Sequence, residues 1–82
     1  MRTKVRIPAP SVGRVVLYGE FKTPRAALVL DVDPRIAGLV RLAIFAPGSP
    51  IEQRWARYGM GLVDCWWWPP RSNVEIEVEV QA

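Results

Sequence analysis

Proline and glycine interrupt this chain every few residues, and their spacing limits it to short segments of secondary structure. Eight prolines and six glycines are spread through 82 residues. Proline cannot donate a backbone hydrogen bond and glycine favours turns, so each cluster ends the element that precedes it. A chain of this length has room for one hydrophobic core. We therefore expect a single domain spanning residues 1–82.

The segments between these residues are rich in β-branched and aliphatic side chains. Such runs, bounded by Gly, Pro and Asp, are typical of strands. The pattern predicts five strands, at residues 14–18, 26–32, 39–45, 63–68 and 74–80. In the last of these, Val or Ile alternates with Glu, which indicates a half-buried strand with an acidic outer face.

Residues 49–58 fit two structures. Residues 49–52 match a capping box with proline at the first helical position, and Ile51, Trp55 and Tyr58 would then share a helical face that Gly59 ends. In an extended conformation, one face would instead carry Gln53, Trp55 and Arg57. The local signals favour the short helix.

Several short strands with at most one short helix indicate a mainly β fold. We expect about five to six strands, arranged as a small SH3-like barrel or a bent antiparallel sheet. Of the small barrel types, the SH3-like one suits 82 residues better than the OB-like one.

The two ends of the chain carry complementary charge patterns. Three basic residues near the N-terminus and three glutamates near the C-terminus occupy alternate positions: Arg2, Lys4 and Arg6, and Glu75, Glu77 and Glu79. Antiparallel pairing would place them opposite one another, each pair contributing roughly 0.2–1 kcal/mol. Two other arrangements fit as well: two independent charged edge strands, or pairing of these ends between the copies of a dimer.

Three of the four tryptophans are consecutive, and two prolines follow them directly. Because side chains alternate along a strand, Trp66 and Trp68 share one face and Trp67 takes the other. We expect Trp66 and Trp68 in the core and Trp67 exposed. Burying one aromatic side chain contributes of the order of 4–6 kcal/mol gross. An exposed Trp67 would forgo that stabilisation, and a binding partner could recover it.

The residue types that many enzymes use are missing. The chain has no histidine and one cysteine, which excludes Ser-His and Cys-His nucleophile pairs, thiolate clusters and imidazole zinc sites. No glycine-rich phosphate loop occurs. We therefore expect a protein that is not an enzyme and binds no cofactor or metal, with Cys65 as a buried, unreactive thiol.

Asp31 and Asp33 form the best pair of carboxylates. On one strand face they could bind a divalent cation or act as acid and base. The simpler interpretation is a strand that ends in an Asp-Pro turn, because Pro34 follows directly.

Positive charge is concentrated in the body of the chain. Residues 1–74 hold eleven cationic side chains against five carboxylates, and nine of the eleven are arginine. Arginine beside aromatic residues can hold phosphate while bases stack on indole, and the same residue types dominate protein-binding hot spots. Of the two uses we favour protein binding. The candidate contact residues are Trp67, Trp55, Tyr58, Arg71, Arg57 and Arg54.

Three segments resemble parts of a known group of proteins. Residues 10–18, PSVGRVVLY, resemble the PS-[LV]-GRIVLY opening of small phage, prophage and actinobacterial proteins of unknown function, and residues 26–29, AALV, are similar to their central strand. Residues 65–71, CWWWPPR, resemble their G-T-W-H-W-P-[PE]-R ending, with Cys65 at the usual threonine and Trp67 at the usual histidine.

This resemblance covers roughly residues 10–71. It implies that the segment around Trp55 is extended rather than helical. The predicted strand at residues 74–80 departs from the family, whose members stop soon after the tryptophan motif, so the role of that strand cannot be inherited.

Together these features predict a phage- or prophage-encoded accessory protein that binds a host protein and modulates or inhibits it, as in host takeover, anti-defence or superinfection exclusion. The alternatives are a nucleic-acid-binding small β-barrel and a virion or tail-associated structural protein. A homodimer through the terminal strands or the tryptophan face also fits.

The chain has no continuous apolar leader and no apolar run long enough to span a bilayer. We therefore expect a location in the host cytoplasm and no membrane partner.

Overall fold

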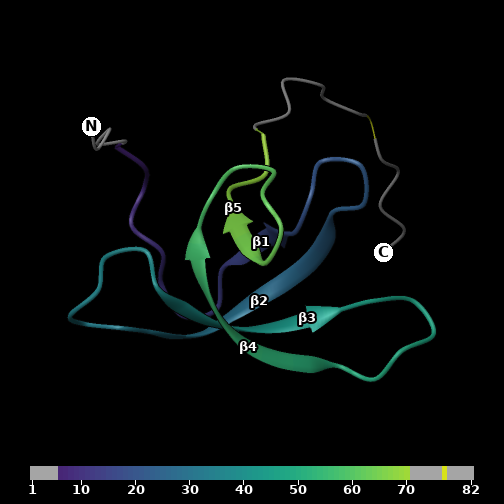
Figure 1. Cartoon of the computed structure of the whole chain (residues 1–82), viewed down its shortest axis with the longest axis horizontal. Coiled ribbons are helices and arrows are strands. Elements are labelled where there is room, and N and C mark those ends of the chain that lie inside the picture. Colours follow the sequence, from purple (N-terminus) through teal and green to yellow (C-terminus); the bar gives the residue numbers. More distant parts are fainter. Residues whose placement is uncertain (1–5, 71–76, 78–82) are drawn as a thin grey trace.

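A computed structural model describes residues 6–70 and Glu77 and shows five strands wrapped into a barrel (Figure 1). The strands are β1 (Val15–Tyr18), β2 (Arg25–Val32), β3 (Val40–Phe45), β4 (Glu52–Tyr58) and β5 (Cys65–Trp67). Four of the predicted strands are confirmed, with boundaries moved by at most two residues. The fifth, at residues 74–80, lies outside the described residues apart from Glu77, and so does the predicted pairing of the two ends.

Strand β4 lies where the local signals favoured a helix, so that prediction is wrong. β4 pairs antiparallel with β3 through five residue pairs, from Val40 opposite Ala56 to Ile44 opposite Glu52. A helix of about ten residues is marginal without tertiary packing, whereas the extended conformation continues the sheet and buries Ala56. The long-range pairing therefore outweighs the capping signal, and the extended conformation that the resemblance implied around Trp55 is confirmed.

The barrel closes through its shortest strand. Neighbouring strands follow the order β1-β2-β3-β4-β5, and β5 also pairs with β1. Every pair is antiparallel except β4 with β5, where only Arg57 and Tyr58 of β4 have partners. A parallel pair ordinarily needs a long crossover connection. Here β5 pairs only with the last two residues of β4, so the chain has to return by only that distance before it continues in the same direction. The short loop after β4 is sufficient for this. This closed mixed barrel is consistent with the predicted small SH3-like fold.

Trp66 lies at the centre of the core and is 0% exposed. Its indole Nε1–H donates a hydrogen bond to the carbonyl of Gly38 (2.7 Å). Tyr58 and Trp68 pack edge-on against its ring, with centroids 5.1 Å and 5.5 Å away. The core position predicted for Trp66 is confirmed, whereas Trp68 is half-buried and packs against the edge of the core.

Trp67 follows the predicted alternation, but the exposure predicted for it is wrong. It lies opposite Leu17 of β1 and is only 7% exposed. Phe21, from the β1–β2 loop, packs edge-on against its ring at 5.1 Å, and the indole Nε1–H donates to the carbonyl of Gly19 (2.9 Å). The loop thus covers the outer face at this point, and Phe21, at 61% exposed, faces solvent in place of the tryptophan.

The Asp-Pro turn predicted after β2 is confirmed. Asp33 Oδ1 accepts hydrogen bonds from the backbone N–H groups of Arg35 (2.7 Å) and Ile36 (2.8 Å). Asp31 Oδ1 accepts one from the N–H of Val32 (2.9 Å). Among the described residues there is no group of three or more potential metal ligands. Asp33 is therefore explained by the turn, whereas Asp31 lies within β2, where the pairing with β3 shifts register.

The burial of Trp67 predicts a difference between two tryptophan substitutions. Trp67→Ala removes a covered ring and should lower the free energy of unfolding by roughly 3–5 kcal/mol. Trp55→Ala removes a ring that is 50% exposed on β4 and should cost much less. Urea unfolding of both variants at neutral pH tests this, and equal losses would contradict the placement of Trp67.

Candidate functional site

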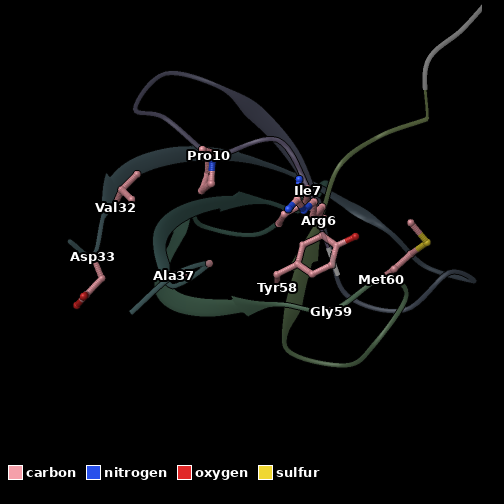
Figure 2. A pocket seen from close by; sticks show the side chains of 11 residues that line it. Arg6, Ile7, Pro10, Val32, Asp33, Ala37, Tyr58, Gly59 and Met60 are labelled. Carbon is pink, nitrogen blue, oxygen red and sulfur yellow. The ribbon is translucent and has the colours of Figure 1, made fainter. Parts of the chain in front are cut away.

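A groove runs along one side of the barrel where three segments that are distant in sequence meet (Figure 2). These are the N-terminal arm (residues 6–10), the β2–β3 connection (residues 33–39) and the end of β4 with the residues just after it. Figure 1 shows the arm, in purple, on the same side of the barrel as the β2–β3 connection. The groove has a volume of about 1020 Å³ and is lined by Arg6, Ile7, Ala9, Pro10, Val32, Asp33, Ala37, Gly38, Tyr58, Gly59 and Met60.

The β2–β3 connection is held in place as one wall of this groove. Gly38 has a φ of +84°, and a Cβ at this position would lie 3.5 Å from Cβ of Tyr58. The carbonyl of Gly38 accepts the Trp66 indole hydrogen bond, and the N–H of Asp33 donates to the carbonyl of Leu39 (2.9 Å), which closes the base of the connection. Glycine suits the left-handed conformation at Gly38, where other residues would be strained.

The N-terminal arm forms another wall of the groove and contacts both the core and Trp68. The side chain of Ile7 packs against the core. The carbonyl of Pro8 accepts a hydrogen bond from Nε1–H of Trp68 (2.9 Å). On the Trp68 ring, the guanidinium carbon of Arg14 lies 5.3 Å from the ring centroid, in a cation–π contact. The position of the arm therefore depends on Trp68.

The lining of the groove is suited to binding. Most of it is apolar, supplied by Ile7, Pro10, Val32, Tyr58 and Met60. The carboxylate of Asp33 is already occupied by two backbone N–H groups. The described lining residues include no serine, threonine, cysteine or lysine. The groove thus offers apolar contact area with a few polar groups at its margins, as ligand-binding clefts do.

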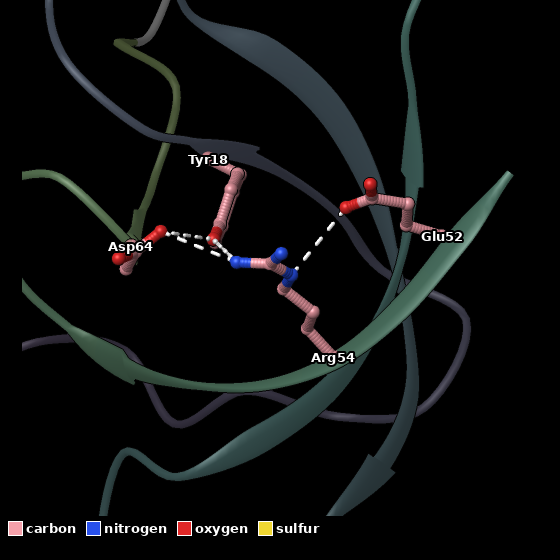
Figure 3. Close-up of polar contacts among 4 residues, drawn as sticks. All are labelled: Tyr18, Glu52, Arg54 and Asp64. Carbon is pink, nitrogen blue, oxygen red and sulfur yellow. Dashed lines mark hydrogen bonds and ion pairs between the residues drawn. The ribbon is translucent and has the colours of Figure 1, made fainter. Parts of the chain in front are cut away.

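A separate polar cluster ties β1 to β4 next to the start of β5 (Figure 3). The hydroxyl of Tyr18 donates to Asp64 Oδ1 (2.9 Å). Arg54 Nη1 lies 3.4 Å from both of these oxygen atoms, and its Nε lies 3.4 Å from Oε2 of Glu52. Burial raises the pKa of the Tyr18 phenol above its ordinary value of 10.0, and the hydrogen bond to Asp64 raises it further. The positive charge of Arg54 is therefore shared between two carboxylates.

The structure does not bring the predicted contact residues together on one surface. Tyr58 lines the groove. Trp55 and Arg57 are exposed on the outer face of β4. Arg54 belongs to the polar cluster and Trp67 is buried. Arg71 lies outside the described residues. Cys65, expected to be buried, is half-buried.

The sequence analysis missed the arm and Met60. Pro8 and Pro10, like the other prolines, are treated in the sequence analysis only as residues that end an element of secondary structure. Their spacing, next to Ile7, was the one available signal for an extended segment that packs on the barrel. Met60 carries no signal of its own, because its position depends on the loop between β4 and β5.

Comparisons with known proteins identify no related family, protein or structure. A scan of protein-family models found no match. Searches of the curated proteins and of the solved structures found none either. The resemblance to small phage and actinobacterial proteins therefore stays a prediction. Within residues 6–70, there is no helix of the length and hydropathy needed to cross a membrane.

The raised pKa of Tyr18 predicts a pH-dependent effect of Tyr18→Phe. At neutral pH the loss of the hydroxyl should cost about 1 kcal/mol. Because the folded-state pKa is above the unfolded-state value, the stability that Tyr18 contributes is complete below about pH 9 and is lost as the pH rises through the folded-state pKa.

Urea unfolding of the wild type and of Tyr18→Phe between about pH 7 and pH 11 checks this. The difference in unfolding free energy should be constant up to about pH 9 and shrink above pH 10. A difference that persists unchanged at the highest pH would show that the phenol titrates alike in the folded and unfolded chains.

Proposed function

We propose that this barrel is a non-enzymatic protein-binding module whose groove receives a segment of a partner protein. The observation that supports this most is the groove itself. Its volume of about 1020 Å³ is at the upper end of the range for ligand sites, and the two walls formed by the β2–β3 connection and the end of β4 are held by the contacts of Gly38 and Tyr58 with Trp66. These two walls can receive an apolar segment with little rearrangement of their own, which limits the entropy cost of binding.

The partner in this proposal is a bacterial host protein. Its basis is the resemblance of residues 10–18 and 65–71 to small phage and prophage proteins. In that setting the module acts in the host cytoplasm as an accessory protein, and by occupying a surface of its partner it modulates or inhibits that protein. Neither a cofactor nor a metal takes part.

Protein binding is preferred to nucleic-acid binding because of where the arginines lie. A nucleic-acid surface needs unpaired cations beside exposed aromatic rings. Of the predicted contact residues, Trp55 and Arg57 meet this requirement on the outer face of β4. Arg54 is instead shared between Glu52 and Asp64, and Trp67 is covered by Phe21. The groove, in contrast, has a mainly apolar lining.

A pair of matched substitutions tests the role of the groove. Met60 lines it and is 57% exposed, whereas Ile51 is 60% exposed and lies outside it. Both changes to glutamate should leave the fold intact, because the side chains are exposed. Met60→Glu places a charge on the apolar surface and should weaken partner binding by roughly 10-fold or more, while Ile51→Glu should have little effect.

The partner is first captured from a nuclease-treated bacterial lysate, identified and purified, and its affinity for the three proteins is then measured by calorimetry. Equal binding by the wild type and Met60→Glu would exclude the groove as the contact surface. Recovery of nucleic acid alone, in an untreated lysate, would favour the nucleic-acid-binding alternative. Recovery of further copies of this chain alone would favour a structural, oligomeric role.

A further inference from the structure

The N-terminal arm lies on the barrel and contacts it through side chains and one carbonyl, as a bound peptide does. Its carbonyl at Pro8 accepts the indole hydrogen bond of Trp68 at 2.9 Å, and Ile7 packs against the core beside it. Among the described residues, this is the one hydrogen bond that joins residues 6–10 to the rest of the chain. The arm is therefore attached by an apolar contact and a single polar contact, not by strand pairing.

The sequence of the arm explains why it binds in this way. In Arg6-Ile7-Pro8-Ala9-Pro10, two residues lack a backbone N–H, so the segment cannot complete a strand ladder. Proline also restricts φ to about −65°, which favours the extended polyproline II conformation and leaves the carbonyls free to accept hydrogen bonds. An indole can bind such a segment in two ways. Its flat ring packs against the proline side chains, and its N–H donates a hydrogen bond to a carbonyl of the segment.

The receiving surface is organised by contacts that do not involve the arm. The ring of Trp68 packs edge-on against Trp66 at 5.5 Å with an interplanar angle of 89°. The guanidinium of Arg14 lies 5.3 Å from the centroid of Trp68. Because Trp66 is fixed in the core, we expect Trp68 to keep its orientation if the arm leaves, and its indole N–H would then need another acceptor.

We propose that residues 6–10 are an internal ligand, and that a proline-containing extended segment of the partner protein replaces them on Trp68. This inference rests on the proposed function and specifies the partner segment: an aliphatic residue followed by proline, with a second proline two positions later, as in Ile7-Pro8-Ala9-Pro10. Because the arm is one wall of the groove, its release also opens the groove toward the incoming segment. Release of the arm and binding of the partner are therefore coupled.

The test uses the full chain and a fluorescein-labelled peptide with the sequence of residues 6–11. Ile7→Asp weakens the internal ligand, because it removes the apolar contact of the arm with the core. If the arm is docked about nine-tenths of the time, this variant should bind the peptide roughly 10-fold more tightly than the wild type. The matched control is Val12→Asp, at a position 65% exposed and outside the arm, which should bind like the wild type.

Two further measurements locate the peptide. Trp68→Phe in the Ile7→Asp background keeps an aromatic ring, although a smaller one, but removes the N–H, and should lower affinity roughly 3- to 10-fold. In the isotope-labelled protein, the indole N–H of Trp68 should show nuclear Overhauser contacts to the unlabelled peptide. The indole N–H of Trp67, bonded to Gly19, should show none. A peptide with glycine at both proline positions should bind weakly.

The outcomes separate this inference from the proposed function. If neither the wild type nor a folded Ile7→Asp variant binds the peptide, the arm is a fixed wall and the inference is wrong. If the peptide does not bind but the partner still binds and Met60→Glu weakens that binding, the proposed function of the groove is supported without the role of the arm. If Ile7→Asp does not fold, the wild type is titrated at about 10-fold higher peptide concentration instead. Binding of the peptide there supports the inference, and absence of binding contradicts it. A dimer formed by exchange of arms between two copies would also overturn it, because the occupant would then be this chain.

Discussion

The buried indole of Trp66 is the interaction on which the rest of this structure depends. Its ring fills the centre of a core that is built mainly from aliphatic side chains, with Tyr18 as its other aromatic member. Because an indole N–H without a partner is costly in such a core, the carbonyl of Gly38 has to lie against it, and it does so at 2.7 Å. This one hydrogen bond fixes the β2–β3 connection relative to β5.

The groove follows from the same side chain. In the sheet register, Trp66 lies opposite Tyr18 of β1 and Tyr58 of β4, so it marks the point where the barrel closes. Tyr58 packs on one part of its ring and lines the groove, and Trp68 packs on another and receives the arm. All three segments that form the groove therefore contact Trp66 directly or through one neighbour.

Much of the barrel could be predicted because its signals are local. Alternating apolar residues and Pro or Gly boundaries located four strands, and strand alternation placed Trp66 and Trp67 on opposite faces. The failures came where a distant segment decides the outcome. Pairing with β3 overrode the capping signal at Ser49, and Phe21 covered a tryptophan that alternation alone leaves exposed.

The site was less predictable than the fold for the same reason. Its walls come from residues 6–10, 32–38 and 58–60, which share no motif and meet only when the barrel closes. Arginine and tryptophan content suggested a contact surface around Arg54 and Trp67, but composition does not show which cations are already paired. Arg54 lies 3.4 Å from two carboxylates, so its positive charge is already paired where β1 and β4 meet.

The central position of Trp66 is tested most directly by hydrogen exchange at the tryptophan indole N–H groups, followed by nuclear magnetic resonance. If Trp66 joins the core to the groove walls, its indole N–H should exchange only on global unfolding, with the same free energy as the slowest backbone amides. That of Trp55, which is half exposed, should exchange rapidly. Exchange of the Trp66 indole as fast as that of Trp55 would show that its bond to Gly38 opens locally and does not hold the groove in place.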